Sequence, residues 1–567
     1  MERRKFLQAL GTVACAGPRA SGLEASPAPE SRARGHGEPR VFLLDDGRHA
    51  GALYEFEPPL EPADLTLTVD QLVESGFDTL IHTSGLHGGI ALYDSHVAQK
   101  LGDNVTRWTH SVHYRGARNL RHLIAHGHDP LKLLCSRCHE KGIWMIASNW
   151  VTLYGGTRAA DGGSGFLSDF VYDHPQFQTG EDRDSRAALA DPARFSFLHP
   201  ELRRERFLVF EELLARYETD GIELNLTEHV PFCKFGEVGE LAPILTQWIR
   251  ELAQVARKAE KAQGLRKRIY VRIPARAEAW KLLGYDVATW VSEKLVDGLI
   301  VLPQQVGATM DQGADLSSAT ELGRKTGCRV LAGLSAHLGS QLETFATAPM
   351  TWAAAANAYA QGADGLGFAQ YVWAPNGWPW THDAYGTARL LGHPELLATA
   401  NKLHRVTSRP RGAKNSPTLL PDESPLLPQP LGEGLPVELR LRLSDRLLEQ
   451  HALGRIDSVR LRIRISNLEP ALNQVRIELN GTPLPESLLK LHDLTYRLYR
   501  SGAITPYGYV YDYSLTPEHY PRPGQNSVKV TLVKSDPNID VVHEVVNVDC
   551  SIDYRPHRNF ESLRLEY

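Results

Sequence analysis

The chain has 567 residues, of which 42% are hydrophobic and 23% are charged, and its formal net charge is −5 at pH 7. This is the composition of a globular protein long enough for two or more domains, and the acidic balance argues against a nucleic-acid or anionic-membrane partner. No apolar run approaches the roughly 18 residues of a transmembrane helix, so no membrane span is predicted.

Residues 1–38 read as an export signal followed by a disordered lead rich in Pro, Ala, Ser and Arg. Arg3 and Arg4 precede Phe-Leu and a weakly apolar stretch, and Cys15 lies in an Ala-Cys-Ala segment that offers a small-residue cleavage site. The pattern resembles a twin-arginine signal and predicts a periplasmic or extracellular protein. The alternatives are a basic tail that stays attached, and lipidation at Cys15.

The next part of the chain alternates short apolar strands with helices. Eight strands are predicted, at 41–44, 78–82, 143–148, 221–226, 268–273, 296–302, 328–332 and 364–369. Each strand after the first follows a helix, as in a TIM (β/α)8 barrel with insertions. The barrel domain is predicted at 39–405, with long loops at roughly 83–115 and 149–198 that are rich in Gly, Tyr, Trp and Asp.

A Pro-rich linker is predicted at 406–434, and an antiparallel β-sandwich follows at 435–567. The sandwich is predicted because several segments alternate apolar and polar residues with period two. These segments are 437–443, 459–465, 474–479, 527–532 and 545–552. The arginines on these strands are expected to form a solvated outer face.

The segment 220–229, Asp-Gly-Ile-Glu-Leu-Asn-Leu-Thr-Glu-His, organises the predicted site. Because a strand has period two, Glu223, Asn225 and Thr227 share one face. A parallel strand covered outside by helices turns such a face into the barrel, where an unpartnered carboxylate costs several kcal/mol. We therefore expect a functional site here, the alternative being a structural Glu–Arg pair at the barrel's centre.

Functional groups of TIM barrels stand at the carboxyl ends of the strands and in the loops after them. Those positions hold carboxylates, amides, His, Arg and aromatic residues: Asp45, Asp46, His82, Asn149, Trp150, Glu223, Asn225, Glu228, Arg272, Arg276, Gln304, His337, Gln370 and Trp373. There is no nucleophile elbow, glycine phosphate cradle or dinucleotide fingerprint, so no cofactor and no metal site is predicted.

This residue set suits a carbohydrate. Glycosidic cleavage needs one protonated carboxyl group and a second carboxylate, while amides, Arg and His bind hydroxyls and aromatic rings stack on sugar faces. The aromatic loop 371–380 is the strongest such platform, although loop packing is an alternative. The predicted substrate-binding residues are His82, Asn149, Trp150, Asn225, Arg272, Gln304, His337, Gln370 and Trp373.

Three stretches carry a family resemblance: 220–225, 271–275 with 284–290, and 296–301. They resemble the glycosyl-hydrolase-like TIM-barrel proteins of polysaccharide-degrading bacteria, often labelled family-10-like glycosylhydrolases. The resemblance covers roughly residues 40–405 and implies an exported carbohydrate-active enzyme with an appended β-sandwich.

The stretch 220–227 is also similar to the chitinase signature Asp-Gly-Ile-Asp-Leu-Asp-Trp-Glu. The position of the chitinase acid falls on Thr227, with Glu228 one residue later. The end of predicted strand seven, Leu-Ser-Ala-His337, lacks the nucleophile Glu of the commonest retaining barrels, and Glu343 lies farther on. A standard double-displacement assignment is therefore not supported.

We expect Glu223 and Glu228 to lie in the site with Asp45 or Asp46 across the barrel mouth. Glu228 is the predicted acid, and an Asp of the strand-one pair is the predicted base or nucleophile. The sequence thus predicts an exported glycoside hydrolase-like enzyme that acts on a polysaccharide or oligosaccharide.

Two other kinds of protein stay open. A metal-assisted TIM-barrel hydrolase would draw ligands from His82, His87, His229 and His337 together with the strand-one aspartates. A non-catalytic carbohydrate-binding protein would keep the barrel without its chemistry. The pair Cys135 and Cys138 is interpreted as structural thiols, because a single CxxC does not make a zinc site.

Overall fold

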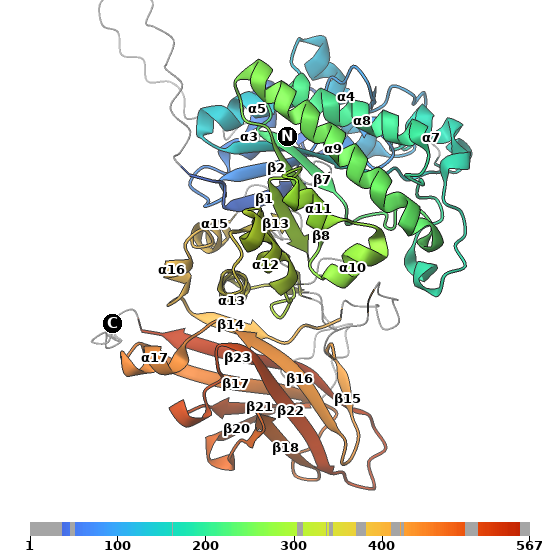
Figure 1. Ribbon diagram of the computed structural model, residues 1–567. Helices are drawn as coiled ribbons and strands as arrows, with labels where there is room; N and C mark the ends of the chain where they lie inside the picture. Colours follow the sequence, from blue (N-terminus) through green and yellow to red (C-terminus); the bar gives the residue numbers. More distant parts are fainter. Residues whose placement is uncertain are drawn as a thin grey trace, which may run out of the picture. The chain divides into compact units, whose positions relative to one another are not determined.

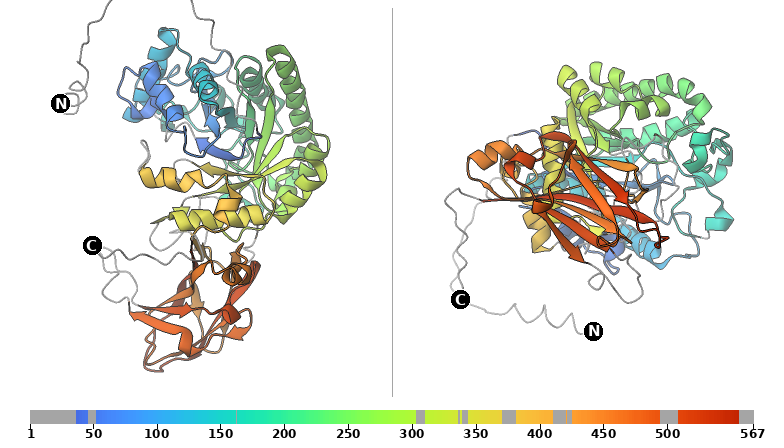
Figure 2. Two further views of the ribbon diagram at one scale, coloured as in Figure 1. Left: turned by 90° about the vertical axis from the view of Figure 1, so that its left-hand side faces the viewer. Right: turned by 90° about the horizontal axis from the view of Figure 1, so that it is seen from below.

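Eight parallel strands close into a barrel in the first part of the chain, and helices cover its outside (Figures 1 and 2). The strands are β1 (Val41–Asp45), β2 (Thr79–Thr83), β6 (Trp144–Trp150), β7 (Gly221–Asn225), β8 (Arg268–Pro274), β9 (Gly298–Leu302), β10 (Arg329–Leu334) and β13 (Gly365–Ala369). Neighbours in the sequence are neighbours in the barrel, and β13 closes it against β1. The predicted TIM barrel is confirmed, and every strand end lies within two residues of its predicted place.

The computed structural model describes the chain in segments. These are residues 37–45, 52–161, 163–302, 310–335, 337–338, 344–369, 381–409, 420, 425–493 and 508–555. The predicted export signal lies outside them, so it stays a prediction. None of the helices in these segments is both long and apolar enough to cross a membrane.

Helices follow the barrel strands as the βα repeat requires. They are α2 (Ala52–Glu55), α3 (Pro62–Asp70), α4 (Ser111–Ala125), α5 (Pro130–Lys141), α6 (Arg158–Asp161), α7 (Asp169–Asp173), α8 (Pro200–Ala215), α9 (Val238–Gln263), α10 (Ala277–Leu283), α11 (Val287–Ser292), α12 (Ser317–Thr326), α13 (Ala348–Ala360), α15 (His382–Arg389) and α16 (Pro394–Leu397). Helix α5 shows how the sequence sets their ends. Asp129 accepts a hydrogen bond from the Leu131 backbone N–H at its start, and Gly142 adopts the left-handed conformation at its end.

The long loops after β2 and β6 carry small elements of their own. A three-stranded sheet, β3 (Gly85–Leu86), β4 (Ile90–Ala91) and β5 (Gln99–Lys100), follows β2, and α6 and α7 follow β6. A two-stranded sheet of β11 (His337–Leu338) and β12 (Thr344–Phe345) follows β10. These elements all leave the carboxyl ends of the strands, where a TIM barrel builds its site.

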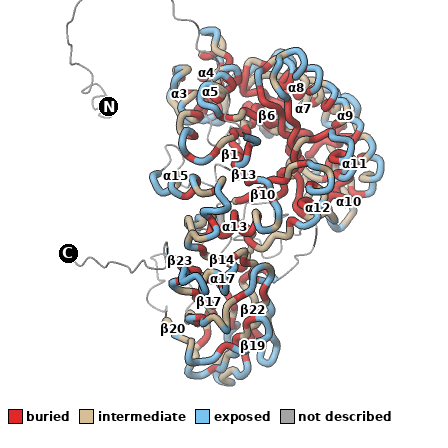
Figure 3. The backbone as a smooth tube through the Cα atoms, turned by 60° about the vertical axis from the view of Figure 1, so that its left-hand side comes forward, coloured by how far each residue is buried: buried red, intermediate tan, exposed pale blue. Residues whose placement is uncertain are grey.

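Large apolar side chains at more than one level fill the lower part of the barrel interior, and we call them the interior cluster. It consists of Phe42, Leu44, Ile81, Ile146, Tyr270, Ile300 and Leu331. Tyr270 fits because Gly298 faces it: a Cβ at Gly298 would lie 2.6 Å from the tyrosine ring. The barrel is therefore a packed core, and the strands appear as buried in Figure 3.

Two antiparallel sheets form the predicted sandwich in the last part of the chain. One has the order β14-β23-β17-β21-β20, with β15 also paired to β23, and the other has the order β16-β22-β18-β19. Their elements are β14 (Lys402–Arg405), β15 (Gln429–Leu431), β16 (Pro436–Leu443), α17 (Leu447–Ala452), β17 (Ile456–Ser466), β18 (Gln474–Leu479), β19 (Thr482–Pro483), β20 (Leu489–Asp493), β21 (Gly508–Ser514), β22 (Gly524–Lys534) and β23 (His543–Tyr554). Apolar side chains of both sheets share one core.

Two strands of the sandwich, β14 and β21, lack the apolar alternation that would reveal them in the sequence. Strand β14 turns Lys402 and His404 toward the core instead of apolar residues, and β21 alternates tyrosines with Val and Asp. Because β14 and β15 both pair with β23, the six-stranded sheet draws strands from 402–405 and 429–431. The predicted domain boundaries at 405 and 434 stay predictions.

A charged cluster lies buried inside the sandwich. Asp445 accepts hydrogen bonds from Lys402 Nζ at 2.9 Å and Tyr554 Oη at 2.5 Å, and lies 2.8 Å from His404 Nε2. The Asp445 carboxylate is fully buried. Burial by itself would raise its pKa, but His404, Lys402 and Tyr554 together hold the pKa well below its usual range. The cluster thus fastens β14 to the turn after β16.

The cysteines of the described segments are all free and buried. Burial raises the pKa of the Cys135 and Cys138 thiols, so both stay protonated at neutral pH. This state fits the interpretation of that pair as structural thiols.

We expect Asp445→Asn to lower the free energy of unfolding by about 3–5 kcal/mol, because it leaves the buried Lys402 ammonium without its counter-charge. The measurement is urea unfolding at pH 7. Asp457→Asn is the matched control, because Asp457 pairs with Arg555 on the exposed surface, and its unfolding midpoint should not change. Equal midpoints for the two variants would contradict the role given to the buried cluster.

Candidate functional site

The polar face of β7 meets its partners inside the barrel. Glu223 is fully buried, and its Oε1 lies 2.7 Å from Arg272 Nε on β8, while Ser148 Oγ on β6 donates to Oε2. These three residues stand on neighbouring strands, and the register places Glu223 directly across from Tyr270 of the interior cluster. Because Arg272 and Ser148 take up both carboxylate oxygens, the arrangement is that of a structural pair at the barrel's centre.

Asn225, two residues farther along β7, shapes the turn that follows the strand. Its Oδ1 accepts hydrogen bonds from the Thr227 backbone N–H at 3.1 Å and from Thr227 Oγ1 at 2.9 Å. Its Nδ2 donates to Glu228 Oε1 at 3.2 Å. Glu228 is exposed, unlike Glu223. The structure therefore places the predicted acid Glu228 at the barrel mouth, with one carboxylate oxygen oriented by an amide.

Five half-buried rings, one of them on His229 next to Glu228 in the chain, form what we call the ring cluster: His87, Trp150, Tyr154, Phe166 and His229. His87 lies at the centre, stacked on Phe166 with ring centroids 5.6 Å apart. The other rings lie 5.5–5.9 Å from His87, and His229 also lies 5.6 Å from Trp150 and 5.5 Å from Tyr154. The cluster unites the loops after β2, β6 and β7.

His229 follows Glu228 directly and has a φ of 57°. Burial lowers the pKa of its imidazole, so the ring is neutral at pH 7. Its Nε2 is buried and has no hydrogen-bond partner among the described residues. A buried polar atom without a partner is costly, and a ligand hydroxyl at this position would satisfy it.

An arginine that the sequence did not single out fixes this loop. Arg194 is fully buried, and its guanidinium donates to the carbonyl oxygens of Pro231 at 2.7 Å, Asp191 at 2.7 Å and Cys233 at 3.1 Å. The loop after β7 is thereby joined to the loop after β6. Arg194 is a positioning residue for the turn that carries Glu228 and His229.

Asp45, the predicted partner acid, is the last residue of β1, and its side chain lies on the outer side of the barrel wall. Leu44 belongs to the interior cluster, so the next residue points toward the helices. Asp45 Oδ2 lies 2.9 Å from His82 Nδ1 on β2, directly across from it. The structure therefore joins Asp45 to His82 and does not bring Asp45 and Glu223 to one face.

Glu55 at the end of α2 adds an acid that the sequence analysis missed. Partial burial and the nearby negative charge of Asp45 raise the pKa of Glu55 to about 7. A carboxyl group that keeps its proton near neutral pH is suited to act as a general acid. Glu55 carries no local sequence signal, because the desolvation and the Asp45 charge that raise its pKa arise only in the fold.

The remaining predicted site residues lie in different parts of the structure, and some lie outside the described residues. Asn149 faces the helices, where its Oδ1 lies 3.5 Å from Arg206 Nη1 of α8, and Trp150 Nε1 donates to the Gly85 carbonyl oxygen at 3.3 Å. His337 lies in β11, but its side chain is not among the described ones. Asp46, Gln304, Gln370 and Trp373, like the aromatic loop 371–380, lie outside the described residues.

No group of three or more His, Cys, Asp or Glu side chains within the described segments is arranged to hold a metal ion. Three of the four histidines that the sequence offered as ligands have other contacts, and the side chain of His337 is not among the described ones. His82 pairs with Asp45, and His87 and His229 pack in the ring cluster.

No protein-family model matches the sequence. No curated protein matches it either. Among solved structures, the chain is similar to the glycoside hydrolase domain of PgaB (BpsB) from Bordetella bronchiseptica, with a TM-score of 0.37 and 13% identity over 63% of this chain and 98% of that one.

Two further structures are similar over most of this chain. An α-L-fucosidase of family GH29 from Bacteroides thetaiotaomicron has a TM-score of 0.35 and 11% identity over 92% of this chain and 98% of that one. A cycloisomaltooligosaccharide glucanotransferase from Paenibacillus sp. has a TM-score of 0.33 and 9% identity over 90% of this chain, which spans 57% of that protein's length. Likenesses at these scores establish neither a substrate nor a catalytic residue for this chain, nor the family-10 resemblance.

We expect Glu223→Gln to lower the free energy of unfolding by about 3–5 kcal/mol, since it leaves the Arg272 guanidinium without its buried counter-charge. Urea unfolding measures the change. Glu228→Gln is the matched comparison, because Glu228 is exposed, and it should leave the midpoint unchanged. The double variant Glu223→Leu with Arg272→Met should regain most of the loss, because a packed apolar pair replaces a buried ion pair at little cost.

Glu55 should bind a proton up to about pH 7. Because its pKa is raised in the folded state, the folded protein holds this proton more tightly, and Glu55 should lower stability as pH rises from about 4.5 toward 7. The difference in unfolding free energy between wild type and Glu55→Gln, measured from pH 4 to pH 8, should grow over this range. A flat difference would mean that Glu55 titrates as an ordinary carboxylate.

Proposed function

We propose that the chain is a glycoside hydrolase that cleaves glycosidic bonds of a polysaccharide or oligosaccharide at the carboxyl end of its barrel. The observation that carries the proposal is the position of Glu228, an exposed carboxylate oriented by Asn225 and joined through His229 to the ring cluster. A carboxyl group beside half-buried rings matches what a sugar presents, because a sugar ring has apolar faces and its glycosidic oxygen must receive a proton.

In this proposal the ring cluster binds the sugar and Glu228 serves as the acid. Trp150 and Tyr154 offer aromatic faces, and the neutral His229 Nε2 accepts a hydrogen bond from a sugar hydroxyl. The partner carboxylate remains, as the sequence predicts, an Asp of the strand-one pair, Asp45 or Asp46; in the structure Asp45 ends β1 and lies beside His82. Glu223 and Arg272 support the site from below and do not contact the substrate.

Export belongs to the same proposal. A polysaccharide is met outside the cytoplasm, and the Arg-Arg segment at the start of the chain suits a twin-arginine signal. Mass spectrometry of protein from the periplasm of a producing cell tests this part, because a chain that begins after Ala16 would show cleavage at the predicted position.

The first test is release of reducing ends from a broad panel of polysaccharides and aryl glycosides by the purified chain. On any substrate that is turned over, Glu228→Gln should lower kcat by at least about 10²-fold with folding intact, as expected for an essential acid. Glu321→Gln on α12 is the control, because Glu321 is exposed on the outer helical layer, and its kcat should equal that of wild type.

Near-wild-type turnover by Glu228→Gln would contradict the assignment of Glu228 as the acid. Oligosaccharide binding without turnover, weakened by Trp150→Ala, would instead indicate a carbohydrate-binding protein on the same barrel. The two outcomes separate because binding needs the ring cluster, whereas turnover also needs the carboxylate.

A further inference from the structure

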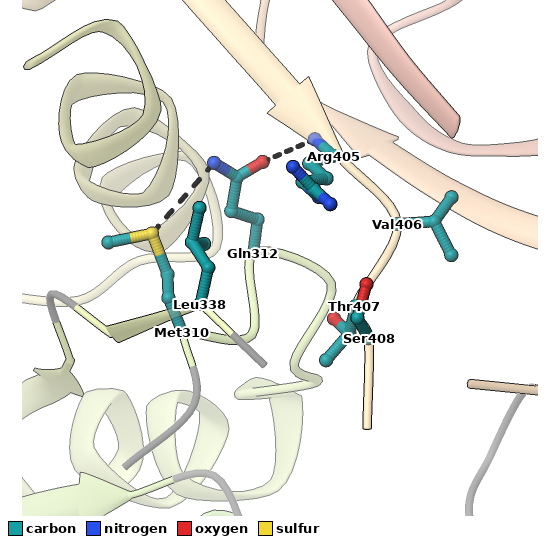
Figure 4. A pocket seen from close by; sticks show the side chains of 7 residues that line it. All are labelled: Met310, Gln312, Leu338, Arg405, Val406, Thr407 and Ser408. Atoms are coloured by element: carbon teal, nitrogen blue, oxygen red, sulfur yellow. Dashed lines mark hydrogen bonds between the residues drawn. The ribbon is translucent and has the colours of Figure 1, made fainter. Parts of the chain in front are cut away.

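A sugar chain that extends beyond the ring cluster needs an open surface of this protein. The cavity between Gln312 and Ser408, shown in Figure 4, has room for about one water molecule and cannot hold a sugar ring. A surface with exposed rings adjoins the ring cluster at Phe166, where the start of α4 meets the loop after β6. Its rings are those of Trp108, His110, His113 and Tyr114, and we call them the outer strip.

His113 connects the outer strip to the ring cluster. Its imidazole meets Phe166 edge-on with ring centroids 4.1 Å apart, and Phe166 is itself stacked on His87. His110 stacks on His113 at 3.8 Å, with 14° between the ring planes. Nδ1 of His113 lies 2.9 Å from the Ser164 carbonyl oxygen, which fixes the orientation of the imidazole. The ring contacts are therefore continuous from the ring cluster to His110.

Trp108 lies beside this contact because two glycines make room for its indole. A Cβ at Gly102 would lie 2.8 Å from the indole, and a Cβ at Gly165, the residue before Phe166, would lie 2.7 Å from it. Both glycines also have a positive φ, 91° at Gly102 and 75° at Gly165, which disfavours any larger residue. The backbone of both loops is thus shaped around the tryptophan ring.

Tyr114 extends the outer strip along α4. Its ring centroid lies 5.8 Å from that of Trp108, and the guanidinium carbon of Arg118 also lies 5.8 Å from it. Tyr114 is 42% exposed, His110 is exposed and Trp108 is half-buried. Exposed rings that continue a candidate site offer a surface for a ligand with apolar faces and polar edges.

Hydrogen bonds between the two loops hold the outer strip in place. Asn104 Nδ2 donates to the Leu167 carbonyl oxygen at 2.9 Å and to Asp169 Oδ1 at 3.2 Å. The Thr109 backbone N–H donates to the Gly163 carbonyl oxygen at 3.3 Å. Because the loops are already joined in this way, a ligand that binds the rings has little ordering of the chain to bring about.

We propose that the outer strip is a second carbohydrate subsite, which binds the sugar units that extend beyond the ring cluster. The inference rests on the carbohydrate substrate of the proposed function, and it adds that this substrate is a chain of several units. Trp108 and Tyr114 stack on the apolar faces of sugar rings, and the Arg118 guanidinium donates to hydroxyl groups. Because these contacts are equal in ground state and transition state, the subsite lowers KM and leaves kcat unchanged.

The test is isothermal titration calorimetry of the full chain with the dimers and hexamers of cello-, malto-, xylo-, chito- and galacturonic oligosaccharides. In at least one series, wild type should bind the hexamer at least about tenfold more tightly than the dimer. Trp108→Ala should remove most of this difference and leave dimer binding unchanged, and Trp108→Phe should restore part of it. Where a hexamer is cleaved, Trp108→Ala should raise KM and keep kcat.

Trp352→Ala is the matched control. Trp352 is another half-buried tryptophan, on α13, and its Nε1 donates to the Thr387 carbonyl oxygen at 3.0 Å. Its variant should keep the wild-type ratio of hexamer to dimer affinity. Thermal unfolding shows that each variant is folded, and Tyr114→Ala supplies the result if Trp108→Ala does not fold, because Tyr114 is exposed.

The inference would be overturned if wild type bound no hexamer, bound hexamer and dimer equally, or shared its affinity ratio with Trp108→Ala. Failure of the proposed function is a different result. A chain that binds hexamers through Trp108 and cleaves none of them keeps the subsite without the hydrolysis. A chain that cleaves hexamers with the same KM in wild type and Trp108→Ala keeps the hydrolysis without the subsite.

Discussion

The arrangement of the barrel interior depends on the buried Glu223–Arg272 ion pair. A carboxylate that is fully buried on a parallel strand needs a counter-charge on a neighbouring strand, and the register of β7 with β8 places Arg272 beside it. Ser148 on β6 supplies the remaining donor. Three adjacent strands are thereby joined inside the barrel.

The chemistry that we propose lies one turn above this pair, where the chain has left the strands. Asn225 and Arg194 shape the loop after β7, so that Glu228 is exposed while His229 is half-buried among rings. Neighbouring residues of one loop therefore have opposite surroundings. That contrast suits a site in which a carboxyl group meets solvent and substrate while the rings exclude water.

The sandwich uses charge in two ways. Inside it, Lys402, His404 and Tyr554 surround the buried Asp445, so no charge of this cluster is left without a counter-charge. On the outer face of the six-stranded sheet the charges alternate from strand to strand and end with Arg405. The arginines that the sequence assigned to this face form cross-strand ion pairs, such as Arg462 with Asp549, and the side chains of Arg460 and Arg462 are 40% and 36% exposed.

The sequence by itself determined the eight-stranded barrel, because buried parallel strands and amphipathic helices leave local patterns of apolar residues, and it also pointed to the polar face at Glu223 and Asn225. It could not find β14, since Lys402 and His404 are buried there only because Asp445 and Tyr554 meet them from distant strands. The tertiary structure alone decided which acids share a site. Glu223 pairs with Arg272, and Asp45 lies beside His82. Desolvation, together with the charge of Asp45, raises the pKa of Glu55, and the ring cluster forms from three separate loops. These properties depend on distances between residues far apart in the chain, and a local pattern does not carry such distances.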